Sequence, residues 1–157
     1  MSYYVIIRGP AGVGKTTIAK TLAKKLDAKY ISFDTIMKKH KLDIVNGSCI
    51  SRKNFITANK IILKSITKKS AILDGCFYHK SQLNHLIKNL PEPPIVFTLS
   101  APIITCINRD EKRKSIGKKS VIAVHKLVSR FDYGYVIETK NMRPKETIDR
   151  MLNIIKK

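Results

Sequence analysis

A glycine-rich run near the start of the chain has the residue types and spacing of a phosphate-binding loop. Residues 9–16 read Gly-Pro-Ala-Gly-Val-Gly-Lys-Thr and fit the pattern G-x-x-x-x-G-K-[ST] in full. Inward-facing backbone N–H groups in such a loop form a nest for anions, and glycine lets the backbone approach the phosphates closely. Lys15 is expected to contact the β- and γ-phosphates, and the Thr16 hydroxyl to bind Mg²⁺. The run predicts binding of ATP and Mg²⁺ by Gly9, Ala11, Gly12, Val13, Gly14, Lys15, Thr16 and Thr17.

Two aspartates follow predicted strands and add carboxylate chemistry. Asp34 comes directly after the strand predicted at 30–33. Phosphoryl transfer to a hydroxyl needs a carboxylate that accepts or orients the acceptor's proton, and Asp34 is the candidate for that role. The alternative is that Asp34 caps the helix that follows it. Asp74 closes the strand predicted at 71–73 in the manner of a Walker B acid and is the second candidate for holding Mg²⁺, with a simple Asp-Gly turn as its alternative.

Two arginines late in the chain are candidates for contacting the triphosphate. Arg109 and Arg113 are four residues apart, which puts them on one face of a helix. Two guanidinium groups over the triphosphate would neutralise the charge on the moving phosphoryl group and exclude water. Ser115-Ile116-Gly117 offers a flexible break after them. The alternative is a solvated basic helix with no catalytic part.

The elements that must position these side chains alternate along the chain. Short β-branched runs predict strands at 3–8, 30–33, 71–73, 95–99 and 135–137. Apolar residues at helical spacing predict helices at 15–26, 52–66, 81–90, 102–113, around 121–131 and around 148–155. Such alternation is typical of an α/β fold with a mostly parallel sheet, and such sheets bind ligands at the carboxyl ends of their strands. With no linker in the sequence, residues 1–157 are predicted to form one domain.

Charge sets this composition apart. The chain has 31 Lys and Arg against 11 Asp and Glu, a net charge of +20. Such a field attracts polyanions, so nucleic acid is a possible partner, and the cluster Lys38, Lys39, His40 and Lys41 after Asp34 is placed for a nucleic-acid backbone. The alternative is a genome-wide bias towards lysine and isoleucine. No apolar run approaches the ~20 residues that span a membrane. Three widely spaced cysteines predict free thiols, and the chain is predicted to be cytoplasmic and not associated with a membrane.

Four segments, together with the glycine-rich loop, resemble one family over nearly the whole chain. They are Ala71–Tyr78, Ile95–Ala101, Cys106–Arg113 and Phe131–Thr139. The sequence resembles the small P-loop kinases that include the polynucleotide 5′-kinase domain, chloramphenicol phosphotransferase, zeta toxins and adenylylsulfate kinase. The resemblance implies a three-layer α/β/α P-loop NTPase fold with a five-stranded sheet in which the strand ending at Asp74 lies beside the first strand. It also implies a helical arginine lid at about 109–120.

The functional prediction is therefore an ATP-dependent kinase that phosphorylates a hydroxyl group. The acceptor is either a nucleic-acid 5′-hydroxyl or a small metabolite or nucleoside. One alternative is a nucleoside monophosphate kinase, although Cys76, Phe77 and Tyr78 stand where adenylate kinases usually carry an aromatic residue, proline and arginine. The other alternative is a regulatory P-loop ATPase that binds nucleic acid. A GTPase is not favoured, because Asn59-Lys60 lacks the aspartate of the guanine-reading motif.

Overall fold

A five-stranded parallel sheet forms the centre of the computed structural model, which describes residues 2–47, 49–67 and 69–157. The strands are β1 (Tyr4–Arg8), β2 (Lys29–Ser32), β5 (Ala71–Gly75), β6 (Ile95–Ser100) and β7 (Tyr135–Glu138). Their order across the sheet is β2-β5-β1-β6-β7, and every neighbouring pair is parallel. This confirms the predicted five-stranded parallel sheet and the place of the strand carrying Asp74 beside the first strand.

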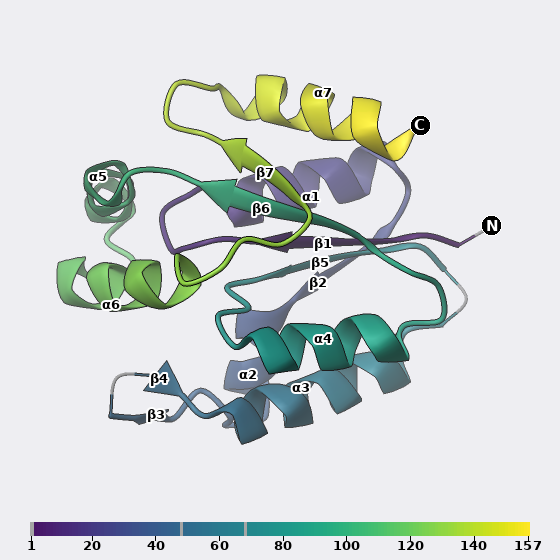
Figure 1. Cartoon of the computed structure of the whole chain (residues 1–157), viewed down its shortest axis with the longest axis horizontal. Helices are drawn as coiled ribbons and strands as arrows, with labels where there is room; N and C mark the ends of the chain where they lie inside the picture. Colours follow the sequence, from purple (N-terminus) through teal and green to yellow (C-terminus); the bar gives the residue numbers. More distant parts are fainter. Residues whose placement is uncertain (1, 48, 68) are drawn as a thin grey trace.

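Helices cover both faces of the sheet and complete three layers (Figure 1). One face carries α1 (Lys15–Lys25) and α7 (Pro144–Ile155). The other carries α2 (Phe33–Lys39), α3 (Arg52–Ser65) and α4 (Lys80–Asn89). Beyond the end of β6, α5 (Ile103–Arg113) and α6 (Lys118–Val128) form a separate pair. In the described part of the chain, no helix is long and apolar enough to cross a membrane.

The alternation of side chains along β1 divides the core in two. Val5 and Ile7 pack with α1 and α7, whereas Tyr4 and Ile6 pack with α3 and α4. All four of these residues are at most 1% exposed, so the strand is buried on both faces, as parallel strands between two helical layers are. This burial fixes the register of β1, and with it the point at which the phosphate loop leaves the sheet.

The structure adds a small element that the sequence did not predict. Strands β3 (Val45–Asn46) and β4 (Cys49–Ile50) pair antiparallel and form a hairpin between α2 and α3. Two hydrogen bonds attach β4 to the segment after β5: Ile50 N donates to the Tyr78 hydroxyl at 2.9 Å, and His79 Nε2 lies 2.8 Å from Ile50 O. The hairpin therefore stands beyond the carboxyl ends of the strands, where it helps to enclose the space in front of the phosphate loop.

Candidate active site

The phosphate loop joins β1 to α1 in a conformation that depends on glycine. Gly12 and Gly14 have φ angles of +79° and +102°, which residues with a Cβ rarely adopt. A Cβ on Gly12 would also collide with the carbonyl of Cys106 on α5. Gly9 differs from the other predicted contacts because it lines neither of the two pockets beside the loop, and a Cβ there would meet Leu99 O at 2.7 Å. Gly9 thus permits close packing of the loop on β6.

Lys15 lies at the centre of the loop and is buried. Its ammonium donates to Pro10 O at 2.9 Å. Burial by itself would lower the pKa of Lys15, but the neighbouring Cys76, Asp74 and Asp34 outweigh burial and raise the pKa above its ordinary value. The side chain therefore carries a full positive charge at neutral pH, held at the mouth of the loop where a phosphate would bind.

Asp74 forms the polar junction between the phosphate loop and the neighbouring strand. Its Oδ2 accepts a hydrogen bond from the Thr16 hydroxyl at 3.1 Å and another from the Tyr30 hydroxyl at 2.8 Å. Burial raises the pKa of Asp74, while Lys15, Tyr30 and Thr16 oppose that rise by favouring the ionised carboxylate. Thr16 and Asp74, both predicted to hold Mg²⁺, are thus in direct contact. A hydroxyl and one carboxylate fit Mg²⁺, which takes its other ligands from water and phosphate.

Tyr30 is a site residue that the sequence analysis missed. In the β2–β5 register Tyr30 stands opposite Ile72, and Ser32 opposite Asp74. Side chains two residues apart share a face of a sheet, so Tyr30 and Asp74 lie on the same face. The predicted strand at 30–33 contained Tyr30, but the pairing that brings it to Asp74 is a property of the sheet. Burial, followed by the charge of Asp74, raises the pKa of Tyr30 to about 12, so the phenol stays a hydrogen-bond donor.

On the prediction that Asp74 holds Mg²⁺, replacing Tyr30 with phenylalanine is expected to weaken the affinity for Mg²⁺ in the presence of an ATP analogue by about tenfold or more, because Tyr30 would support a metal ligand. The hydroxyl of Tyr30 favours the ionised form of Asp74, so its loss raises the pKa of Asp74 further. Metal binding needs the ionised form and is lost as pH falls through that pKa. The pH below which Mg²⁺ affinity is lost should therefore be higher in the variant. Titration calorimetry at a series of pH values measures this acid limb.

A matched control for this variant is Tyr3→Phe. The Tyr3 hydroxyl also makes one hydrogen bond, donated to Leu26 O at 2.8 Å, but it lies away from Asp74. An acid limb that stays in place in Tyr30→Phe, or that moves equally in Tyr3→Phe, would contradict the positioning role of Tyr30.

A cavity of about 730 Å³ opens in front of the phosphate loop. Lys15 and Thr16 line it from the loop, and Asp34 lines it from α2. Asp34 does not end the strand, as the sequence suggested, because β2 stops at Ser32 and Asp34 lies in the first turn of α2. The capping alternative for Asp34 is wrong as well: the Ser32 side chain caps α2 and accepts from Thr35 N at 3.2 Å. The Asp34 side chain is exposed and does not cap the helix.

The two predicted arginines have different surroundings. Arg109 is held by the protein: its guanidinium donates to Val13 O at 3.2 Å, to Thr139 Oγ1 at 3.2 Å and to Thr139 O at 2.9 Å. It lines a second, smaller pocket of about 330 Å³ on the α7 side of the loop, together with Thr17, Met142 and Pro144. Arg113 is exposed and lines both this pocket and the larger cavity. Arg109 therefore links α5 to the phosphate loop, whereas Arg113 is free to reach a ligand.

The predicted break after Arg113 is a turn held by a buried carboxylate. Helix α5 ends at Arg113, Lys114 adopts a left-handed conformation, and α6 starts at Lys118. Asp110, which is 1% exposed, accepts from Ile116 N at 3.1 Å and from Gly117 N at 2.9 Å. Carboxylates that accept from amides near a helix N-terminus stabilise it. The sequence analysis missed Asp110, since nothing in the sequence separates it from the charged residues around it.

Replacing Asp110 with alanine is expected to lower the free energy of unfolding by about 1–3 kcal/mol, because two amides lose a charged acceptor. The turn should also open more often, and trypsin should then cleave after Lys114 faster. Urea unfolding and timed proteolysis measure the two effects. Glu111→Ala, an exposed neighbour on the same helix, serves as the control and should change neither. Equal cleavage rates in the two variants would contradict a clamping role for Asp110.

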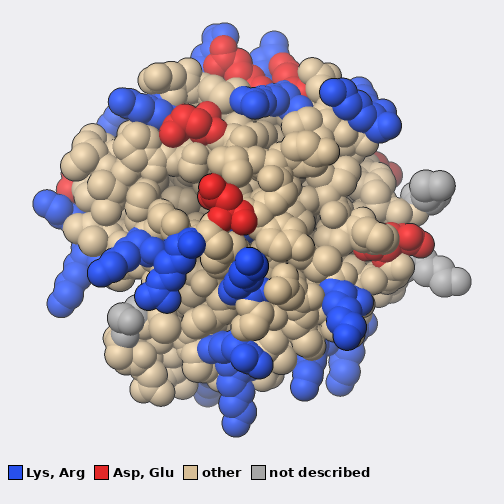
Figure 2. Space-filling view, viewed as in Figure 1, with Lys and Arg blue, Asp and Glu red and all other residues tan. Residues whose placement is uncertain are grey.

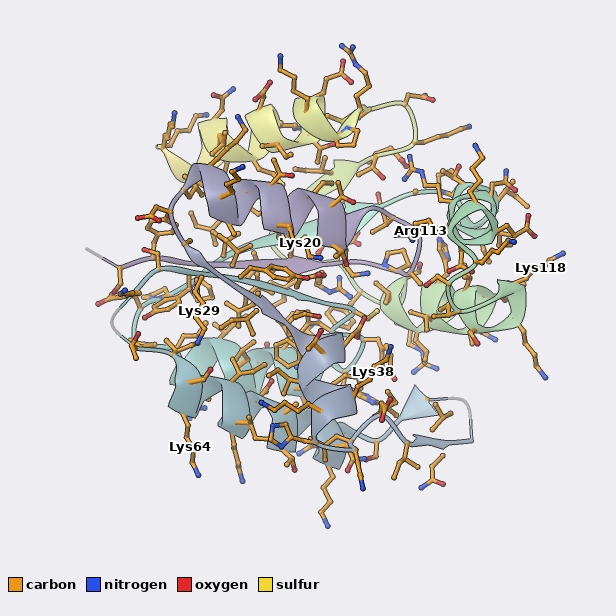
Figure 3. The ribbon with its side chains drawn as sticks, turned by 180° about the vertical axis from the view of Figure 1, so that it is seen from behind. Lys20, Lys29, Lys38, Lys64, Arg113 and Lys118 are labelled. Carbon is orange, nitrogen blue, oxygen red and sulfur yellow. The ribbon has the colours of Figure 1, made fainter. Side chains whose placement is uncertain are left out.

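The large positive charge is spread over the surface. Figure 2 shows Lys and Arg side chains scattered over one face and separated by uncharged surface, with acidic side chains among them. Within the described residues, one ion pair is formed, between Arg143 and Glu146 at 3.5 Å. Figure 3 shows Lys38 and Arg113 on the side where the strands end, while Lys20, Lys29 and Lys64 lie on other parts of the molecule. Of the cluster Lys38–Lys41, Lys38 lines the cavity.

The comparison with protein families gives one match that covers most of the chain. A family model described as an AAA domain matches residues 5–132. The matched region runs from β1 to the turn before β7 and includes the phosphate loop, Asp34, Asp74 and both arginines.

Several curated relatives and solved structures are similar to this chain, at sequence identities below 40%. A cytidylate kinase of Saccharolobus islandicus is 36% identical over 79 residues, which is 45% of this chain and 42% of that protein, so the match spans less than half of the relative. Shikimate kinase 2 of Escherichia fergusonii is 24% identical over 144 residues, covering 88% of this chain and 76% of that one. The structure of a sugar kinase from Janibacter sp. HTCC2649 has a TM-score of 0.78 at 17% identity, covering 99% and 95% of the two chains. The last likeness supports the fold.

Proposed function

The chain belongs to the AAA domain family, and we propose that it is an ATP-dependent kinase that transfers the γ-phosphate of Mg-ATP to a hydroxyl group. One observation carries the proposal: Lys15 of the phosphate loop and the exposed carboxylate of Asp34 line the same cavity. A kinase needs a phosphate-binding cation and a carboxylate for the acceptor's proton in one enclosed space. The names of the relatives, cytidylate kinase and shikimate kinase, support the same reaction class.

Each site residue has a task in this proposal. The loop from Ala11 to Thr17 would cradle the phosphates, with Lys15 holding the β- and γ-phosphates. Thr16 and Asp74 would hold Mg²⁺, which would add positive charge next to the phosphate oxygens. Asp34 would orient the acceptor hydroxyl and take up its proton. Arg113 would reach over the transferred group from α5, and Arg109 would keep that helix docked on the loop through Val13 and Thr139.

The region of residues 109–120 would act as a lid in this enzyme, with Arg109 as its fixed end and the residues after it as the moving part. All residues from Glu111 to Ser120 are exposed, and Arg113, Ser115, Ile116, Lys119 and Ser120 line the cavity. Movement of this segment towards the loop would exclude water from the phosphates, which suppresses hydrolysis of ATP. The clamp at Asp110 supports movement as a unit, because the turn between α5 and α6 is held together.

A transfer assay with γ-labelled ATP and Mg²⁺ tests the proposal. The acceptors are 5′-hydroxyl DNA and RNA oligonucleotides, nucleosides, nucleoside monophosphates and neutral small alcohols. Label on any hydroxyl supports a kinase. Label found only in free phosphate, with all acceptors present, would contradict a kinase and favour the regulatory ATPase. Transfer to an oligonucleotide end would indicate that the net charge of +20 serves to bind the nucleic-acid backbone. Its KM should then rise steeply between low and moderate salt.

A nucleoside monophosphate kinase is the second candidate, and the match to cytidylate kinase is the observation that favours it. Such an enzyme must grip the phosphate of its acceptor, and arginine is the usual residue for that purpose. Arg52 at the start of α3 is exposed and does not line the cavity. Preferential labelling of CMP, UMP, AMP or dTMP in the same assay would establish this alternative.

A further inference from the structure

The cavity has two ends of different chemistry. The end at the phosphate loop is polar, with Lys15 and Thr16. The far wall is formed by α2, the β3–β4 hairpin, the start of α3 and the segment after β5, and it is mostly apolar. Six of its side chains are hydrophobic: Phe33, Met37, Val45, Ile50, Phe55 and Phe77. This wall is where an acceptor would lie, because Asp34 lines the cavity from α2 and its charge acts on Lys15 of the phosphate loop.

The wall also carries a neutral polar group, the Tyr78 hydroxyl. Burial raises the pKa of Tyr78 to about 12, so the hydroxyl keeps its proton at neutral pH. Tyr78 accepts a hydrogen bond from Ile50 N, and no described residue accepts its own proton. Apart from the exposed Asp34 and Lys38 of α2, the wall therefore offers the Tyr78 hydroxyl as a neutral donor beside its apolar side chains.

Among the described residues, the far wall carries one cation, Lys38 of α2, and this residue is exposed. Arg113 and Lys119, which also line the cavity, are exposed and belong to the lid segment. Two exposed acids, Asp34 and Asp43, line the cavity as well. A carboxylate or phosphate bound against the aromatic side chains of this wall would lose water without gaining a buried ionic partner, which is strongly unfavourable.

We propose that the acceptor is an uncharged compound that presents its hydroxyl to Asp34 and lays an apolar or aromatic face against Phe33, Phe55 and Phe77. The inference rests on the proposed kinase function and narrows its acceptor. A volume of about 730 Å³ is within the range of pockets that hold drug-sized molecules, so a ring system fits beside the transferred phosphate. The Tyr78 hydroxyl would donate to a polar atom of that ring system and orient it.

Matched sets of acceptors test this inference. Cytidine is compared with cytidine 3′-monophosphate, thymidine with its 3′-monophosphate and with a 5′-hydroxyl oligothymidylate, and benzyl alcohol with 4-(hydroxymethyl)benzoate and 4-(aminomethyl)benzyl alcohol. Glucose is included as a neutral polyol without an apolar face. We expect the neutral member of each set to have a kcat/KM at least about tenfold above its charged analogues, and glucose to be a poor acceptor. Calorimetry with a non-hydrolysable ATP analogue should give the same order of affinities.

A cation introduced into the wall should change this preference. Val45 lines the cavity and is 60% exposed, so Val45→Arg adds a guanidinium without filling the core. Its neighbour Ile44 is 62% exposed and does not line the cavity, so Ile44→Arg is the matched control with the same added charge. Val45→Arg should lower the ratio of kcat/KM for cytidine to kcat/KM for cytidine 3′-monophosphate several-fold, and Ile44→Arg should leave this ratio unchanged.

The outcomes separate the inference from the function on which it rests. The inference would be overturned if kcat/KM were higher for the charged acceptors, for glucose or for the oligonucleotide than for the neutral aromatic and nucleoside acceptors. The proposed kinase function would still stand in that case. Equal effects of Val45→Arg and Ile44→Arg would overturn the role of the wall. No transfer to any hydroxyl by protein that binds the ATP analogue would overturn the proposed function, and the inference with it. Preference for the neutral acceptors, narrowed by Val45→Arg alone, supports both.

Discussion

Replacing Asp34 with asparagine is expected to lower kcat for phosphoryl transfer by about 10²–10⁴-fold, the usual contribution of a general base. Asparagine keeps the size of the side chain but does not take up the acceptor's proton. Affinity for ATP should stay within about twofold, because Lys15 and the loop remain in place and lose only the neighbouring charge of Asp34. The variant should also fold normally, since the cap of α2 is Ser32 and Asp34 is exposed. Steady-state kinetics with the best acceptor, together with calorimetric ATP binding, measure both effects.

Asp43→Asn provides a matched control for this experiment. Asp43 is exposed and lines the same cavity, so its replacement removes the same charge from the same space. If both variants lose activity equally, the effect is electrostatic and Asp34 has no special position. If Asp34→Asn keeps more than half of the wild-type kcat, Asp34 is not the base.

Replacing Lys15 with methionine is expected to lower kcat/KM by about 10²–10³-fold, the cost of removing a preorganised charge from the developing transition state. Methionine keeps most of the apolar stem in this buried position, so the fold should be retained. Affinity for ATP should fall as well, in contrast to Asp34→Asn, because Lys15 is expected to contact the β- and γ-phosphates. Fluorescent-nucleotide binding and initial rates report the two losses.

Lys24→Met is the control for this variant. Lys24 lies on the same helix, is exposed and lines neither pocket, so its loss changes the net charge by the same amount. Since the pKa of Lys15 is raised, its charge persists through the neutral range, and the defect in Lys15→Met should be the same at pH 6 and pH 9. A defect that appears only at one end of this range would contradict a fixed ammonium at the loop.

Features that depend on contiguous segments of the chain could be predicted from the sequence. The glycine-rich loop is a contiguous motif, so its residues, its strand and its helix were all predictable from local order. The parallel sheet followed from alternating strands and helices, because short strands joined through helices pair in parallel. The boundaries of the five strands differ from the predictions by at most two residues, as expected when the ends of strands depend on pairing.

Features that depend on contacts between distant segments were missed. The bond from Tyr30 to Asp74 arises from the pairing of β2 with β5, which no local pattern encodes. In the sequence, Asp110 is one acid in a charged run. Only the structure shows that its buried carboxylate accepts two hydrogen bonds from the α5–α6 turn. The capping of α2 was assigned to the wrong residue because Ser32 and Asp34 are both good caps and only the backbone geometry distinguishes them.

The sequence by itself predicted a phosphate-binding loop, since the loop's glycines, lysine and threonine act through local backbone geometry. It also placed Asp74 towards the end of a strand and Arg109 and Arg113 on one helix. Tertiary structure alone decided what faces the phosphates: six apolar side chains from four separate segments meet at one wall of the cavity. Those segments are far apart in the chain and are brought together by the packing of α2, α3 and the β3–β4 hairpin beyond the sheet. On the proposal made above, that wall would select the acceptor, because any group bound against it must lose its water.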